Sequence, residues 1–161
     1  MSSQTKAVDA KALRKTVLNM AYAGSAVHIS CVFSIIELLA VLYRSHVRYP
    51  GNDPLAAGRD YLVLSESHGV MAQYACMREL GWLKDDAFAN HFSDGSDLRG
   101  LSDSRIPGLE VTSGSLGHGF SVGVGLATGT KLRGTDQKTY ALVGDGDIKS
   151  IDRFRCARNG H

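Results

Sequence analysis

Apolar residues recur at helical spacing near the start of the chain. Leu13, Val17 and Met20 stand four and three positions apart within residues 9–23, so they would share one face of a helix. Asp9 stands where a side chain can cap the first helical turn. The pattern predicts a helix over residues 9–23 whose apolar stripe packs against the rest of the protein.

A second helix is predicted over residues 33–47, where apolar side chains again recur three and four positions apart. Ser30 or Ser34 is suited to cap its start. A loop rich in Pro, Gly, Asn and Asp follows over residues 50–58. The expected core face of this helix consists of Ile35, Leu38, Leu39 and Leu42.

Two short apolar runs, residues 60–64 and 139–143, have the length of buried strands. The first is followed by a polar turn over residues 65–69, and the second by a Gly-containing turn over residues 144–147. Helical patterns separate the two runs, and this alternation is typical of the α/β class. Because ligands of such proteins bind beyond the carboxyl ends of the strands, both turns are candidate binding sites.

Three further helices are predicted over residues 70–80, 83–92 and 120–132, with a long polar loop over residues 93–110. Loops of this length in a compact domain are usually functional or mobile. The helix over residues 120–132 contains several glycines, each of which costs about 1 kcal/mol relative to alanine. We therefore expect a neighbouring helix, subunit or ligand to pack tightly against it.

The composition is that of an ordinary globular protein, with 43% hydrophobic and 21% charged residues in a chain of 161. The net charge is +2 without a block of like charge, so nucleic acid is not an expected partner. No apolar run approaches 18 residues, so no membrane span is expected. Scattered cysteines without a CxxC pair favour a cytoplasmic location over a disulfide or zinc scaffold; they are Cys31, Cys76 and Cys156.

The turn after the second strand has the residue types of a metal–diphosphate site. Gly144 and Gly146 allow phosphate oxygens to approach the backbone closely. Asp145 between them offers a hard oxygen ligand of the kind that Mg²⁺ takes. The chain ends 16 residues after this aspartate, at His161.

Each candidate has an ordinary structural explanation when it is taken alone. A histidine after a strand, such as His68, is often a capping or surface residue, and the same holds for His28 between two helices. The Gly-rich loop over residues 114–119 can serve only to begin a helix, and Gly-Asp-Gly after a strand is a common turn. No single one of these features assigns a function.

Taken in order, the segments resemble the N-terminal diphosphate-binding domain of the transketolase family, or of a split transketolase N-terminal subunit. The resemblance covers residues 8–148 and is most specific in the segment before the Gly-Asp-Gly turn. It implies an α/β fold with three layers around a parallel sheet, incomplete at its C-terminus, with residues 1–147 as a partial domain. The resembling segments are Gly24–His28, Ser34–Tyr43, Tyr61–Gly69, Pro107–Gly119 and Ala141–Gly146.

The resemblance also implies the chemistry: transfer of a two-carbon ketol unit between sugar phosphates, with thiamine diphosphate and Mg²⁺ (or Ca²⁺) as cofactors. A C-terminal transketolase-type subunit or a homodimer partner would supply the rest of the site. By position in the family pattern, the implied catalytic residues are His28 and His68, the implied cofactor contacts are His68, Gly114, Leu116, Gly144 and Gly146, and the implied metal ligand is Asp145.

The chain departs from the family pattern at three places around this site. Ser67 precedes His68 where glycine is usual, and Glu66 brings a negative charge towards a diphosphate. Leu101 stands where a histidine is common, and His28 lacks its usual small neighbours. These substitutions favour a rival hypothesis, a non-catalytic homologue that binds a transketolase-type partner; a plain α/β domain with coincidental glycines is the third hypothesis.

Residues 148–161 match none of the family pattern, and we expect them to be a non-family tail, such as a frameshift read-through or a truncated gene. The second metal ligand, an asparagine in the family, has no counterpart there. Without further strands, the strand over residues 139–143 would expose an unpaired edge. We therefore expect a marginal, aggregation-prone fold and no activity from the isolated chain.

Overall fold

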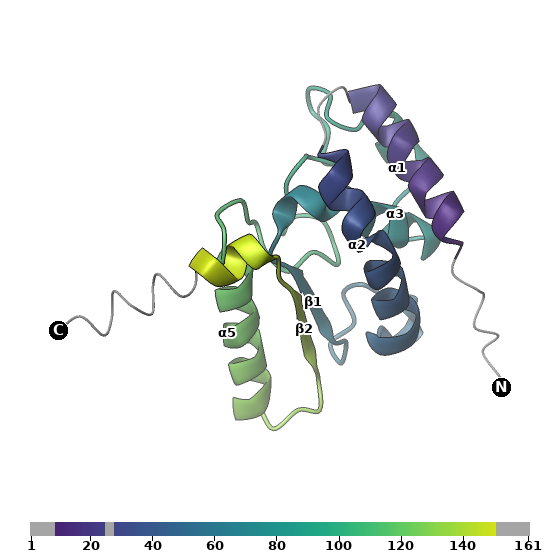
Figure 1. Ribbon diagram of the computed structural model, residues 1–161. Helices are drawn as coiled ribbons and strands as arrows, with labels where there is room; N and C mark the ends of the chain where they lie inside the picture. Colours follow the sequence, from purple (N-terminus) through teal and green to yellow (C-terminus); the bar gives the residue numbers. More distant parts are fainter. Residues whose placement is uncertain (1–8, 25–27, 151–161) are drawn as a thin grey trace.

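Two parallel strands run through the middle of the fold, between helices on either side (Figure 1). The computed structural model describes residues 9–24 and 28–150. Strand β1 (Tyr61–Leu64) pairs with β2 (Thr139–Leu142), so that Tyr61 lies opposite Thr139 and Leu64 opposite Leu142. Both predicted strands are confirmed, each about one residue shorter than expected.

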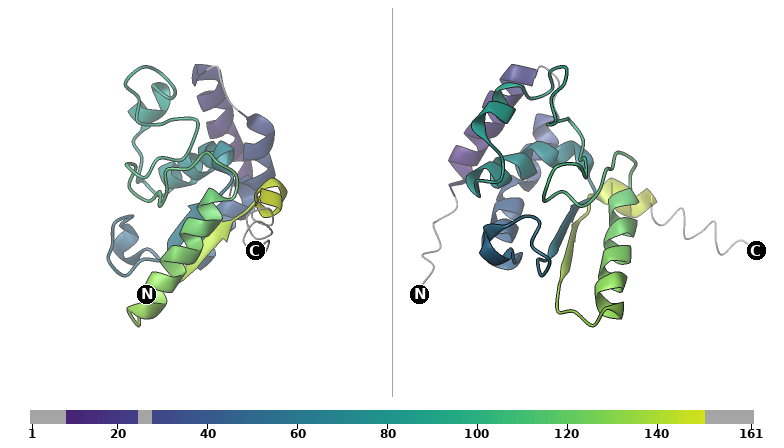
Figure 2. Two further views of the ribbon diagram at one scale, coloured as in Figure 1. Left: turned by 90° about the vertical axis from the view of Figure 1, so that its left-hand side faces the viewer. Right: turned by 180° about the vertical axis from the view of Figure 1, so that it is seen from behind.

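Alternate residues of the strands face two different layers. Leu62 and Leu64 belong to the main hydrophobic core, and Leu142 packs against that core. A methyl group built on Gly123 of helix α5 (His118–Leu132) would contact Ala141 and Val63. Figure 2 shows the result from two further sides, with α5 on one face of the strands and the other long helices on the opposite face. The three layers confirm the predicted α/β class.

Helices α1 (Ala10–Gly24), α2 (Ile29–Val41) and α3 (Val70–Glu79) form the larger layer. The prediction for α1 is confirmed in detail, because Asp9 Oδ1 accepts a hydrogen bond from the Ala12 N–H at 3.0 Å. Helix α3 is buried along almost its whole length. The buried face of α1 consists of Leu13, Val17 and Met20, as expected.

Helix α2 begins four residues earlier than predicted, and neither serine caps it. His28 stands at its N-cap without a side-chain hydrogen bond, and the Ser34 hydroxyl donates to the Cys31 carbonyl inside the helix. The early start includes Val32 in the helix, where its side chain is completely buried. Tertiary packing, rather than capping by a serine, therefore sets the start of α2. Leu38, expected in the core, is 48% exposed, while the buried face consists of Val32, Ile35, Ile36, Leu39 and Ala40.

The stretch Ile29–His46 is long and apolar enough to span a membrane by length and composition, with a mean hydropathy of 1.4. A window of this kind was not expected from the sequence. In the fold it forms α2 and the π-helical turn Leu42–His46, and Ile36 and Leu39 of α2 are completely buried. A core helix of a folded domain meets the same criterion, so the stretch does not by itself indicate a membrane.

Helix α5 reaches the end of β1 through a close backbone approach. A methyl group at Gly119 would lie 2.5 Å from the Ser65 Cα atom, so only glycine fits there. Gly123 packs against the strands, whereas a methyl group at Gly125 would meet nothing within 4 Å among the described residues. Close packing is therefore present in the first half of the helix, but the neighbour is the strand pair and the turn after β1 rather than the expected helix, subunit or ligand.

A buried carboxylate joins the starts of the two strands. Asp60 is 0% exposed and accepts hydrogen bonds from the Arg48 backbone and guanidinium and from the Lys138 N–H. Burial alone would raise the pKa of Asp60, but these hydrogen bonds outweigh burial and lower it. Ionised Asp60 thus fixes the register at the edge opposite the candidate site.

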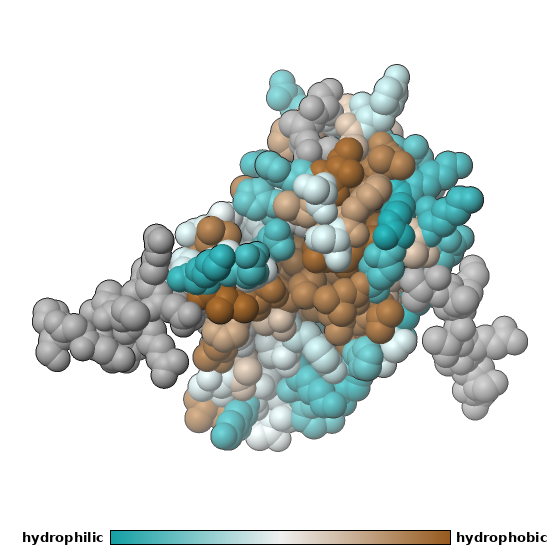
Figure 3. Space-filling view, in the orientation of Figure 1, coloured by the Kyte–Doolittle hydropathy of each residue, from teal (hydrophilic) through white to brown (hydrophobic). Residues whose placement is uncertain are grey.

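Short elements complete the described chain. They are the 3₁₀ turns Pro50–Asn52 and Ser67–Gly69, helix α4 (Asp85–Ala89) and a helical turn over residues 145–150. Of the expected tail, residues 148–150 are helical, and residues 151–161 lie outside the described residues. Figure 3 shows apolar surface between α2 and this last helical turn. Both elements carry exposed apolar side chains, since Leu38 and Val41 of α2 and Ile148 of the helical turn are each 43–54% exposed.

Candidate active site

The two candidate turns meet at one edge of the sheet because the strands are parallel and in register. The Ser65 N–H donates to the Leu142 carbonyl at 2.9 Å, which carries the pairing one residue past β1. The Ser65 hydroxyl in turn accepts a hydrogen bond from the Phe120 N–H at the start of α5. The turn after β1, the turn after β2 and the N-terminal end of α5 are thereby held together.

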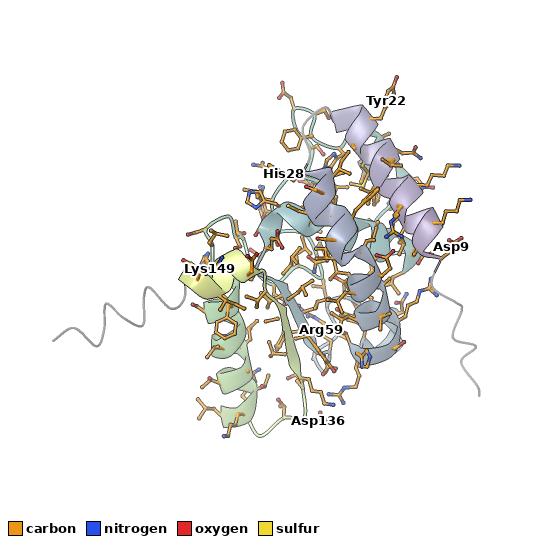
Figure 4. The ribbon with its side chains drawn as sticks, in the orientation of Figure 1. Asp9, Tyr22, His28, Arg59, Asp136 and Lys149 are labelled. Atoms are coloured by element: carbon orange, nitrogen blue, oxygen red, sulfur yellow. The ribbon has the colours of Figure 1, made fainter. Side chains whose placement is uncertain are left out.

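His28 and His68 come from different elements and face each other. His28 precedes α2, at the end of that helix labelled in Figure 4, and His68 lies in the 3₁₀ turn after β1. Their ring centroids are 4.9 Å apart with the planes at 85°. His28 is exposed and His68 is half-buried. Two imidazoles that touch in this way can hold or move a proton on a group bound beside them.

Both histidines line a cavity of about 1100 Å³. Its opposite wall comes from the loop between residues 92 and 114, which includes Gly114 of the predicted cofactor loop. This volume lies just above the usual range for small-molecule sites, which is roughly 300–1,000 Å³. The long polar loop that the sequence marked as functional or mobile is therefore a wall of this cavity.

Apolar side chains form part of this wall. Phe92 has a positive φ of 65°, which is unusual for a bulky residue. Its ring packs closely over Gly100, where an added methyl group would lie 2.6 Å from the Phe92 Cε2 atom. Leu101 is the residue found where the family commonly has histidine. A methyl group built on Gly114 would lie 3.2 Å from the Leu101 Cδ1 atom. Phe92 was not predicted as a site residue, because nothing local to it indicates a left-handed backbone.

Asp147 is the buried carboxylate of the turn after β2, and its role was not predicted from the sequence. It is 0% exposed. Its Oδ1 accepts a hydrogen bond from the Gly117 N–H at 2.6 Å, and its Oδ2 accepts one from the Gly144 N–H at 3.0 Å. The Asp147 carboxylate thus joins the Gly-rich loop before α5 to the Gly-Asp-Gly turn.

A local signal for this role was present in the sequence. The Ile148 N–H donates to the Gly144 carbonyl, which makes Gly144 the N-cap of the helical turn over residues 145–150. Asp147 is then the third residue of that helix. An acidic side chain at this position commonly reaches back to the N-cap N–H, as one half of a capping box.

Asp145, the predicted metal ligand, lies on the surface. Its side chain is 95% exposed and forms an ion pair with Lys149 at 3.6 Å on the same helical turn, labelled in Figure 4. Within residues 9–24 and 28–150, no three His, Cys, Asp or Glu side chains come together in a way that could hold a metal ion. The described residues therefore offer one accessible carboxylate rather than a complete metal site.

The predicted loop residues lie next to the Gly-Asp-Gly turn. A methyl group on Gly146 would come within 3.8 Å of the Leu116 side chain, which is 50% exposed. The Ser150 hydroxyl donates to the Leu116 carbonyl at 3.3 Å. The structure thus brings Leu116, Gly144 and Gly146 together, while Gly114 and the two histidines line the adjoining cavity.

Residues 4–152 match the protein family described as the transketolase thiamine diphosphate binding domain. The chain belongs to this family. An apulose-4-phosphate transketolase subunit from Phocaeicola vulgatus is 35% identical over 161 residues, covering 100% of this chain and 57% of that protein. A 6-deoxy-6-sulfo-D-fructose transketolase subunit from a Clostridium species is 32% identical over 139 residues, covering 86% of this chain and 50% of that protein.

Solved transketolases share the fold of this family member. Transketolase from Leishmania mexicana superposes with a TM-score of 0.75 at 30% identity, covering 92% of this chain and 24% of that one. The likeness confirms the predicted transketolase-type α/β fold. The chain spans little more than half the length of the two relatives named above.

The candidate site has room for a small-molecule cofactor, but its charge does not suit a diphosphate. The cavity beside the two histidines has a volume of about 1100 Å³. Glu66, however, lies with its Oε2 atom 3.1 Å from the position of a methyl group built on Gly144. A carboxylate at that point opposes an anionic diphosphate, and the metal that would offset it lacks a complete set of ligands among the described residues.

Proposed function

We propose that this chain contributes the diphosphate-binding part of a thiamine-diphosphate-dependent transketolase, which transfers a two-carbon ketol unit between sugar phosphates. The observation that carries the proposal is the facing pair of His28 and His68. The pair lies on a cavity of about 1100 Å³ at the carboxyl ends of two parallel strands, in a chain of the transketolase family.

The roles proposed for individual residues follow from their places. His28 and His68 would donate hydrogen bonds to substrate oxygens and take up or release a proton there. His68 would also contact the cofactor's diphosphate, together with backbone at Gly144 and Gly146. Gly114 and Leu116 would contact the rest of the cofactor, and Asp145 would be the first ligand of Mg²⁺ (or Ca²⁺).

A second polypeptide is part of this proposal. Two relatives carry the word subunit in their names, and this chain spans only about half of each. We infer that a C-terminal transketolase-type subunit, or a homodimer partner, completes the active site. The scattered cysteines support a cytoplasmic setting for such an assembly.

The test is reconstitution. The full chain is mixed with a separately expressed C-terminal transketolase-type subunit, thiamine diphosphate and Mg²⁺, and two-carbon transfer from a ketose phosphate to an aldose phosphate is measured. We expect transfer in the mixture and none from either chain alone, with a loss of at least 100-fold on His68→Ala, in line with the roughly 10²–10⁴-fold contribution of a positioned acid–base group. Transfer that is unchanged by His28→Ala and His68→Ala contradicts the proposed roles.

A second candidate function is binding of a transketolase-type partner without catalysis. Two observations favour it: the carboxylate of Glu66 beside Gly144 and the apolar Leu101 against Gly114. This alternative predicts that the chain binds the C-terminal subunit in size-exclusion chromatography with no effect of thiamine diphosphate on the complex. Tighter assembly in the presence of the cofactor favours the catalytic function.

A further inference from the structure

The Glu66 carboxylate faces the backbone of the turn after β2. Glu66 lies two residues past the end of β1, and the parallel pairing brings this position beside Gly144. The Oε2 atom lies 3.1 Å from a methyl group built on Gly144, which places it in contact with the glycine itself. The side chain is half-buried, so water screens its charge only in part.

Within the described residues, Glu66 takes part in no ion pair. On its other side lies the Cys31 thiol of α2, whose pKa is raised by burial and then by the Glu66 carboxylate. A thiol supplies no positive charge in either of its protonation states.

The turn also offers less to an anion than its glycines suggest. The Gly144 N–H already donates to Asp147, as does the Gly117 N–H. A diphosphate approaching Gly144 would therefore meet one carboxylate in contact with the turn and a second whose oxygen lies 3.5 Å from the same built methyl group. Lys149, the cation on the following helical turn, is paired with Asp145.

We propose that the negative charge of Glu66 weakens the binding of a diphosphate at the Gly144 turn. The inference rests on the proposed function, because it concerns the cofactor of that same site. Repulsion between unit charges a few ångströms apart, at the effective dielectric of a protein surface, opposes binding. Removal of the carboxylate is therefore expected to tighten thiamine diphosphate binding about tenfold.

The experiment is calorimetric titration of the full chain with three probes: thiamine diphosphate, inorganic pyrophosphate and thiamine, each with and without Mg²⁺. Glu66→Gln removes the charge and keeps the shape of the side chain. Glu37→Gln is the matched control, because Glu37 is a half-buried glutamate of α2 that pairs with Arg14. Circular dichroism verifies that each variant is folded, and Glu66→Ala provides a second variant.

We expect Glu66→Gln to bind thiamine diphosphate and pyrophosphate about tenfold more tightly than the wild type. Thiamine, a cation that lacks the diphosphate, is expected to bind no more tightly to Glu66→Gln than to the wild type. Glu37→Gln is expected to behave as the wild type. The gain is expected to be larger without Mg²⁺, since a bound divalent cation screens the repulsion.

The alternative results are distinguishable. Equal binding of thiamine diphosphate by wild type and Glu66→Gln overturns this inference and leaves the proposed function standing. Weaker binding by Glu66→Gln in the presence of Mg²⁺ makes Glu66 a metal ligand and also overturns it. Absence of binding by both proteins at millimolar cofactor, with a C-terminal subunit present, overturns the proposed function and this inference with it.

Discussion

Replacing Asp147 by asparagine tests the hydrogen bonds that hold the two site loops together. The carboxylate is completely buried and accepts from the Gly117 and Gly144 N–H groups at 2.6 and 3.0 Å. Hydrogen bonds to a charged group contribute about 1.5–3 kcal/mol each. Asparagine keeps one acceptor but turns an NH₂ group towards the other N–H, so one bond is lost and one buried donor is left unpaired.

We therefore expect Asp147→Asn to lower the free energy of unfolding by about 2–4 kcal/mol, which is a large share of the roughly 5–15 kcal/mol typical of a domain. Urea unfolding at pH 7, followed by circular dichroism, measures this change. Asp145→Asn is the control, because this neighbouring side chain is 95% exposed and its ion pair with Lys149 lies on the surface. Its expected effect is within about 0.5 kcal/mol.

A loss of less than about 0.5 kcal/mol in Asp147→Asn refutes the reasoning, because a buried carboxylate with two such partners cannot be replaced at so small a cost. Equal destabilisation by Asp145→Asn refutes it as well, because it would place the important carboxylate on the surface side of the turn.

Three further predictions concern stability, each measured by urea unfolding. Gly119→Ala is expected to lower the free energy of unfolding by about 1–3 kcal/mol, because the added methyl group clashes with Ser65. Gly125→Ala, which has open space around it, is expected to raise the free energy of unfolding by up to about 1 kcal/mol. Equal effects of the two substitutions contradict the packing of α5. Burial lowers the pKa of His91 below its usual 6.5. The contribution of neutral His91 to the free energy of unfolding is therefore complete above about pH 6.5 and is lost as the pH falls through the folded pKa. This pH dependence is expected to disappear in His91→Phe. Hydrogen bonds lower the pKa of Asp60 below its usual 3.8. Asp60→Asn is therefore expected to lower the free energy of unfolding by about 2 kcal/mol at pH 7, and this difference shrinks as the pH falls from 3.8 through the folded pKa. A difference that does not change with pH contradicts this.

The regular elements could be predicted because their patterns are local. Leu13, Val17 and Met20 repeat at helical spacing, and one surface of α1 is indeed buried. The start of α2 could not be predicted in this way. The helix begins at Ile29, before both serines, and Val32 is buried against other elements. The residues around Val32 in the sequence carry no pattern that would predict this tertiary contact.

The identity of the site residues could be predicted from the sequence better than their arrangement in space. The histidines at positions 28 and 68 could be named from the family resemblance, but their contact depends on how α2 packs beside the turn after β1. The direction of the Glu66 side chain likewise depends on the parallel register of β1 with β2. Asp147 was within reach of sequence reasoning, since an acid at the third helical position is a known capping pattern.

The most direct test of the central claim is amide NMR spectroscopy of the full chain during titration with thiamine diphosphate and Mg²⁺. Even millimolar binding shifts the amide signals of residues at the site. We expect shifts at residues 114–117 and 144–147 and at His68, with none along α1. Absence of shifts at millimolar cofactor in both the wild type and Glu66→Gln, or shifts confined to other surfaces, would contradict the assignment of this cavity and these turns as the cofactor site.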